Sequence, residues 1–177
     1  MKEKEKSTFR KIEYHKKESF YLIVRGVEVG VFAGLISVLY RFLLSVAETQ
    51  LYKILDCIKE NPIKIIIWLA VLAAIGAGVA LICKWEPMAG GSGIPQVNGE
   101  IKGHFSPSWW RVILGKLIGG TASVFCGLSL GREGPSVQLG GMAGKGIAKI
   151  TKADKTTELR MISCGAGAGM AAAFNAP

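Results

Sequence analysis

Two long apolar stretches, residues 20–47 and 63–83, constrain this chain more than any other feature. Each is long enough to cross a bilayer as a helix, which takes about 20 residues. Arg25, Glu28 and Arg41 interrupt the first stretch. Arg25 and Glu28 lie three residues apart on one helix face and could pair locally, and the alternative is that these side chains snorkel or lie at the membrane interface. Half of the 177 residues are hydrophobic. Because they gather in runs of this length, the pattern predicts an all-α, multi-pass membrane protein.

Charge gives the expected topology. Residues 1–19 hold seven Lys or Arg against four Glu, whereas residues 48–62 hold two Lys against three acids. Basic residues favour the cytoplasmic side of a membrane. We therefore predict a cytoplasmic basic leader at 1–19, a transmembrane domain at 20–177, and an external loop at 48–62. The net charge of +9 is attributed to topology, since few aromatic residues accompany the basic ones as RNA binding would require.

Beyond residue 84 the apolar segments are short and are broken by glycine and proline. They cover 88–97, 109–131, 132–150 and 159–177. Interrupted helices inside a bilayer are tolerated where they are buried in protein or line a wet cavity. Such breaks are typical of transporters whose binding site is built from helix ends near the membrane midplane. A second set of basic residues predicts that a later loop is also cytoplasmic: Lys145, Lys149, Lys152, Lys155 and Arg160.

Glycines elsewhere in these segments predict close helix packing. Gly26, Gly30 and Gly34 form a four-residue stripe in the first span, and 165–169 reads GAGAG. Small residues at this spacing let another helix approach closely.

Two turns carry the candidate chemistry. In Gly91–Pro95 (GSGIP), proline can open a helix because the N–H that it lacks would be unpaired there. The free N–H groups of a helix start and its partial positive charge make an anion site, to which Ser92 adds a hydroxyl donor. An ordinary N-cap serine is the alternative reading of the same residues.

The second turn is Gly131–Pro135 (GREGP). A carboxylate at a helix start is stabilised by the exposed N–H groups, so Glu133 could occupy an anion site until protonation released it. An ionisable residue among apolar helices is a functional candidate. The alternative is an interfacial loop in which Arg132 and Glu133 face water. A permeating anion suits helix starts, because partial charges compensate its desolvation without trapping it.

No cofactor, metal site or enzymatic activity is predicted. His15 and His104 are isolated, and the four cysteines form no CxxC pair.

The segments GSGIPQV (91–97), WWRVILGKLIGG (109–120), GREGPSVQLGG (131–141) and GAGAGMAAAFNAP (165–177) closely resemble, in order, the N-terminal half of the CLC chloride channel and proton/chloride antiporter family. The resemblance implies a CLC-type fold with interrupted and re-entrant helices, of which this chain is the incomplete first of two inverted repeats. It also implies roles for individual residues. Ser92 matches the serine whose hydroxyl coordinates the central chloride, and nitrate-preferring plant members have proline there. Glu133 matches the gating glutamate and proton acceptor.

Further residues are implied at the same site. Backbone groups at Gly93, Ile94, Gly134 and Pro135 and just beyond would line the two helix starts around chloride. Arg132 matches a basic residue near the outer entrance, and Lys116 matches a lysine that favours anions without contact.

The function implied is chloride transport across the plasma membrane by a voltage-gated-chloride-channel-type homodimer with a cytoplasmic N-terminus. We expect proton/chloride exchange gated by Glu133, with chloride, protons and the lipid bilayer as partners and no nucleic acid. A passive chloride channel of the same family and a non-conducting membrane fragment remain the alternatives. The family's second half, with its own helix starts and a tyrosine hydroxyl at the chloride site, would lie beyond Pro177.

Overall fold

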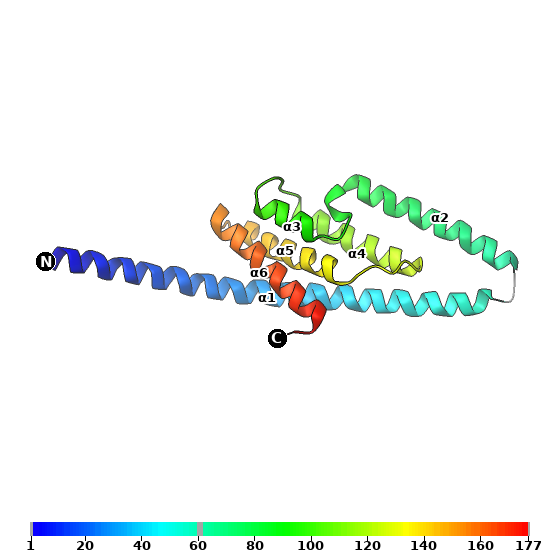
Figure 1. The fold of residues 1–177 in the computed structure, drawn as a ribbon, viewed down its shortest axis with the longest axis horizontal. Helices are drawn as coiled ribbons and strands as arrows, with labels where there is room; N and C mark the ends of the chain where they lie inside the picture. The colour runs from blue at the N-terminus through cyan, green and yellow to red at the C-terminus, as the bar shows by residue number, and fades with distance from the viewer. Residues whose placement is uncertain (1, 60–61, 177) are drawn as a thin grey trace.

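The computed structural model describes residues 2–59 and 62–176. For residues 2–19 it describes the backbone alone. Within them, all regular secondary structure is helical. The elements in chain order are α1 (Lys2–Ile58), α2 (Pro62–Trp85), the short 3-10 helix η1 (Pro87–Ala89), α3 (Ile94–Ile101), α4 (Trp109–Phe125), α5 (Glu133–Ile150) and α6 (Lys155–Phe174). Helix α1 is the long axis of the molecule, and the shorter helices gather along it (Figure 1).

Helices cover both stretches that were predicted to span the membrane, but the prediction of a loop at 48–62 is largely wrong. Helix α1 continues to Ile58, and α2 begins at Pro62. The sequence 48–58 contains neither glycine nor proline, and Leu51 continues the buried face of α1. Among the described residues, two helices are long and apolar enough to cross a membrane, over Phe20–Ile58 and Pro62–Trp85.

The buried face of α1 is not the glycine stripe. A Cβ atom at Gly26, Gly30 or Gly34 would meet nothing within 4 Å among the described residues. The close helix approach predicted there is therefore not made by this part of the chain. The face in contact instead carries larger side chains at helical spacing: Val29, Ala33, Ser37, Tyr40 and Leu44. Arg25 and Glu28 pair with each other at 2.6 Å, the local pairing that their spacing allows.

Helices α5 and α6 form the tightest contact in the fold. A Cβ atom at Gly140 would lie 2.1 Å from the carbonyl oxygen of Gly165, and one at Gly169 would lie 2.1 Å from that of Ser136. These pairings run antiparallel and bring the two backbones into direct contact. The close packing predicted for the GAGAG segment is confirmed. It leaves α5 buried from Ser136 to Ala148, so this helix forms the centre of the molecule.

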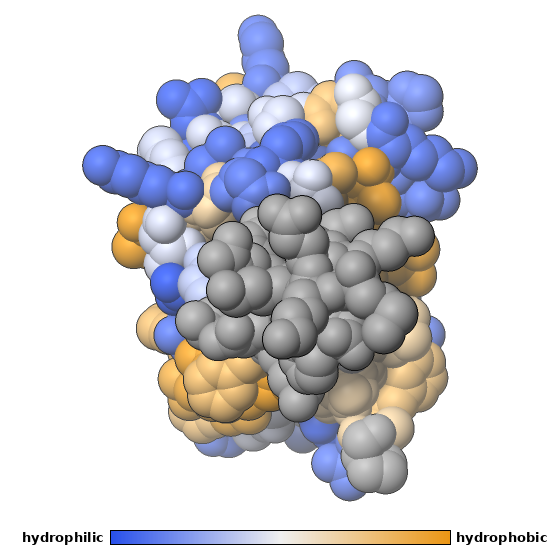
Figure 2. All heavy atoms as spheres, turned by 90° about the vertical axis from the view of Figure 1, so that its left-hand side faces the viewer, coloured by the Kyte–Doolittle hydropathy of each residue, from blue (hydrophilic) through white to orange (hydrophobic). Residues whose placement is uncertain are grey.

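The second basic cluster is mainly a surface feature. Lys149, Lys152, Lys155 and Arg160 are exposed around the connection between α5 and α6. Seen from that end of the molecule, hydrophilic residues gather over the upper part of the face and apolar ones lie below (Figure 2). Lys145 does not belong to this surface, contrary to expectation, because its side chain is 2% exposed.

Candidate functional site: two helix starts in contact

The GSGIP and GREGP turns, about 40 residues apart in sequence, meet in space. Helix α3 begins at Ile94, one residue before Pro95, and α5 begins at Glu133, two residues before Pro135. A helix therefore starts at each turn, as predicted, with its proline inside the first turn. A Cβ atom at Gly134 would lie 2.2 Å from the carbonyl oxygen of Ser92, and one at Gly93 would lie 2.8 Å from that of Gly134. The two helix starts therefore touch backbone to backbone, and only glycine permits this approach.

The loop before α3 has a left-handed backbone at two positions. Gly91 has φ 69° and Gly93 has φ 98°, values that residues with a side chain rarely adopt. Gln96 closes this loop on itself. Its Nε2 donates to the Gly90 carbonyl at 2.9 Å, and its Oε1 accepts from the Gly93 N–H at 3.0 Å.

Lys116 holds the same loop from α4. Its Nζ donates to the carbonyls of Ala89 at 2.9 Å and Gly91 at 2.6 Å, with a longer contact to Gly90 at 3.5 Å. The residue is 5% exposed. The loop carbonyls point toward the buried ammonium of Lys116. The N–H groups of the loop and the Ser92 hydroxyl are therefore the donors available on the other side of the loop. The positive charge stays within the site.

Gln138 is the residue of this site that sequence reasoning missed. Its side chain is fully buried on α5, and its Nε2 donates to the Met88 carbonyl at 2.7 Å. It also packs against Gly93, where an added Cβ would lie 2.7 Å from the Gln138 Cβ. The available signal was its place four residues after Gly134, on the same helix face, in a segment of small and apolar residues.

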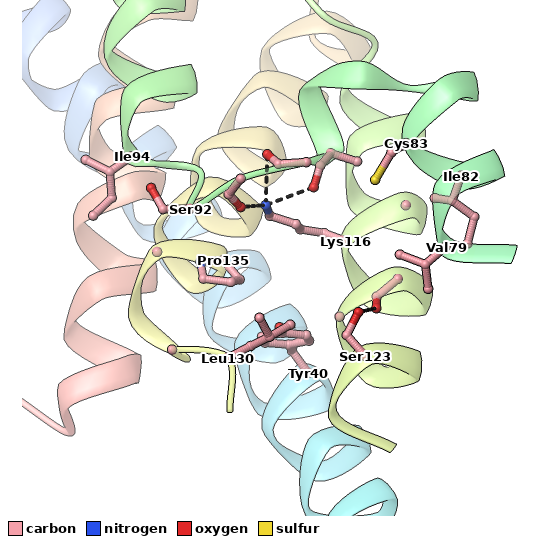
Figure 3. Close-up of a pocket in the computed structure, with 18 of the residues that line it drawn as sticks. Tyr40, Val79, Ile82, Cys83, Ser92, Ile94, Lys116, Ser123, Leu130 and Pro135 are labelled. Carbon is pink, nitrogen blue, oxygen red and sulfur yellow. Dashed lines mark hydrogen bonds between the residues drawn. The ribbon is translucent and has the colours of Figure 1, made fainter. Parts of the chain in front are cut away.

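A cavity of about 570 Å³ lies beside the two helix starts. Among the predicted site residues, those that line it are Ser92, Ile94, Lys116, Glu133, Gly134 and Pro135. The remaining walls come mainly from α2 and α4, with Tyr40 of α1 and Leu130 at the end away from Lys116 (Figure 3). Its surface is mostly apolar, with few polar groups, as in sites that orient a small ligand.

Glu133 is the first residue of α5 and is exposed, and its carboxylate makes no hydrogen bond or ion pair with any described residue. The expected carboxylate held by helix-start N–H groups is therefore not the arrangement in this structure. Arg132 does not line the cavity. It pairs with Glu48 of α1 at 3.2 Å, with both side chains about half exposed.

Two of the predicted backbone donors are already occupied. The Gly93 N–H donates to Gln96, and the Ser136 N–H donates to the Arg132 carbonyl at 3.3 Å. Pro135 has no N–H to offer. The structure brings Gly93 into the site as a packing residue, and it leaves the N–H groups of Ile94 and Gly134 among the candidate donors.

Similarity to known proteins agrees with this geometry. The sequence model of the voltage gated chloride channel family matches residues 75–177, which is more than half of the chain and includes both turns. The chain belongs to this family. It is thus part of a membrane transporter family and is not an enzyme.

Individual relatives in this family are exchangers by name. The chain is 36% identical over 166 residues to the H⁺/Cl⁻ exchange transporter ClcA of Vibrio campbellii, a match that covers 90% of this chain and 35% of the relative. It is also 36% identical over 174 residues to ClcA of Yersinia pestis, covering 95% and 36% of the two chains.

The fold agrees with a solved member of the family. The crystal structure of a slow cyanobacterial Cl⁻/H⁺ antiporter matches with a TM-score of 0.72 and 34% sequence identity, over 87% of this chain and 37% of the other. The chain thus spans little more than a third of the length of these relatives.

Proposed function

We propose that this chain forms the first part of a chloride/proton exchanger in the plasma membrane, with Glu133 as its gate and proton acceptor. One observation carries the proposal. Two helix starts touch each other beside a cavity that Ser92 and Glu133 both line, in a chain of the voltage gated chloride channel family. The names of its relatives favour exchange over passive conduction.

Chloride would bind where the partial positive charges at the starts of α3 and α5 add. A bare anion loses tens of kcal/mol of hydration in an apolar medium, so it needs donors at the site. The Ser92 hydroxyl and the N–H groups of Ile94 and Gly134 are donors of this kind. Lys116 adds a full positive charge, but its ammonium is already bonded to loop carbonyls. It would therefore attract the anion without holding it, which lets the anion leave again.

Glu133 would couple chloride to protons through competition. Its carboxylate and a chloride ion carry the same charge and seek the same donors at the start of α5. When a proton from water binds the carboxylate, the neutral acid loses this attraction and chloride can take its place. The free, exposed carboxylate of Glu133 in this structure is available for such a movement.

The wider assembly is part of the same proposal. We place the N-terminus and residues 1–19 in the cytoplasm, and we infer that a second, inverted repeat supplies the remaining donors around chloride. One such pathway would lie in each subunit of a homodimer. Chloride flux from liposomes is therefore measured for the full product of the gene and for residues 1–177 alone. Efflux through residues 1–177 alone would contradict the need for a second repeat.

The gate is tested with Glu133→Gln, which mimics the protonated acid. In the full gene product, we expect chloride flux to persist while its pH dependence and proton transport fall. Glu48→Gln is the matched control, because Glu48 is a nearby acid that does not line the cavity. Unchanged proton coupling in Glu133→Gln would refute the role of this residue. A passive channel would show chloride flux without proton transport in the unmodified protein.

A further inference from the structure

We propose that the hydroxyl of Tyr40 is a further hydrogen-bond donor of the anion site. It would donate to a negatively charged acceptor at the end of the cavity away from Lys116. This acceptor is either a free halide or the carboxylate of Glu133. The inference rests on the proposed function and adds a residue of α1 to it.

The first observation is an unused buried hydroxyl. Tyr40 is 0% exposed, and its hydroxyl has no hydrogen-bond partner among the described residues. Its ring packs in an apolar cluster with Leu44 and Leu139. Leaving a polar group buried and unpaired is unfavourable, so an unpaired hydroxyl that lines a cavity points to a ligand. A phenylalanine would fill the same apolar space without this cost.

The second observation is where the hydroxyl lies. A Cβ atom at Gly120 would be 2.6 Å from the Tyr40 Oη, which places the oxygen against the wall formed by α4. Gly120 and Tyr40 both line the cavity that Glu133 lines. Tyr40 and Leu130 line the end of the cavity away from Ser92 and Lys116 (Figure 3). The Tyr40 hydroxyl is therefore a donor at the end of the cavity opposite the Ser92 hydroxyl.

The surrounding charges select an anion as the acceptor. The start of α5 contributes a partial positive charge, and Lys116 contributes a full one within the same cavity. The other hydroxyl of this wall does not compete for the ligand, because Ser123 donates to the Gly119 carbonyl at 2.7 Å. Hydrogen bonds to an ionised acceptor are stronger than those to a neutral one, so a phenol hydroxyl that lines this cavity favours an anion.

Tyr40→Phe removes the hydroxyl and keeps the ring, and it is measured in the full gene product alone and combined with Glu133→Gln. We expect Tyr40→Phe to weaken the apparent chloride affinity roughly 3- to 30-fold if the acceptor is a halide, and to do so again in the Glu133→Gln background. If the acceptor is the Glu133 carboxylate, Tyr40→Phe should shift the pH dependence of flux, and the shift should vanish with Glu133→Gln. Gly120→Ala should act in the same direction, because its methyl group displaces the hydroxyl.

Ser37→Ala is the matched control. Ser37 lies on the same helix, is 0% exposed and also has an unpaired hydroxyl among the described residues, but it does not line the cavity. Chloride affinity and pH dependence that are both unchanged in Tyr40→Phe would overturn the inference, as a structural water would then be its partner. Equal effects of Ser37→Ala and Tyr40→Phe would overturn it too. Absence of chloride transport in the unmodified protein would instead refute the proposed function.

Discussion

The Glu100 carboxylate and the Lys145 ammonium form an ion pair closed off from solvent, with side-chain exposures of 0% and 2%. Lys145 also donates to the Ser106 hydroxyl at 3.0 Å and to the Pro107 carbonyl at 2.5 Å. The pair joins the C-terminal end of α3 to the middle of α5. Helix α3 is only eight residues long, so this anchor lies close to the turn before Ile94, where Ser92 lines the cavity.

Removing one partner of this pair should destabilise the fold strongly. Lys145→Met leaves the Glu100 carboxylate buried and unpaired, which costs about 3–5 kcal/mol. We expect a clear drop in the melting temperature in detergent. Lys59→Met is the control, because Lys59 and Asp56 are 72% and 69% exposed in their pair and such pairs contribute about 0–1 kcal/mol. Similar melting temperatures for the two variants would contradict the importance of the buried pair.

Two nearby glycines of α6 should respond in opposite ways to the same substitution. In Gly165→Ala the new methyl group would lie 2.1 Å from the Gly140 carbonyl oxygen, so α5 and α6 must separate. Overpacking of this kind costs about 1–3 kcal/mol. Gly167→Ala meets nothing within 4 Å among the described residues and should gain up to about 1 kcal/mol from helix propensity. Thermal unfolding of both variants tests the contact, and equal shifts would argue against it.

Ser92→Pro should weaken the preference for chloride over nitrate. The substitution removes the hydroxyl donor from the turn at the cavity. A difference of about 0.5–1.5 kcal/mol between the two anions in their use of this donor corresponds to roughly a two- to tenfold change in their ratio. Relative flux of the two anions through the full gene product measures it. Ser92→Thr keeps a hydroxyl and should keep the preference. An unaltered ratio in Ser92→Pro would remove Ser92 from the ligands of chloride.

Acid stability should depend on Asp154, in the connection before α6. Hydrogen bonds hold the pKa of this carboxyl below its usual value. The largest contribution comes from the Thr157 hydroxyl, and smaller ones come from the backbone N–H groups of Thr157 and Thr156. A lowered pKa in the folded state stabilises the protein above the unfolded pKa, about 3.9, and this contribution is lost as pH falls through the folded value. Asp154→Ala should therefore lower the melting temperature at neutral pH and reduce its fall in acid.

Asp154→Asn separates the cap from its titration. Asparagine also accepts hydrogen bonds at a helix N-cap but carries no charge. We expect it to retain part of the neutral-pH stability while losing the acid dependence that Asp154 contributes. An acid dependence identical to that of the unmodified protein, in both Asp154 variants, would show that this carboxyl has no part in it.

The sequence by itself determined the features that follow local rules. Runs of apolar residues predicted both spans, and the two prolines after glycine-rich turns predicted where α3 and α5 begin, since a helix start tolerates a missing N–H. The GAGAG segment predicted a close helix contact because glycine alone lets two backbones meet. These signals do not depend on which other helix is nearby.

Only the tertiary structure decided which side chains meet. The contacts made by three features depend on how helices far apart in sequence rotate and cross: Gln138, Tyr40 and the Glu100–Lys145 pair. The hydropathy of the sequence does not predict that rotation or that crossing. The same is true of Lys145, which belongs to a basic run in the sequence but lies inside the fold. Burying a charge or a hydroxyl costs free energy unless a partner offsets it, and packing in three dimensions decides which group becomes that partner.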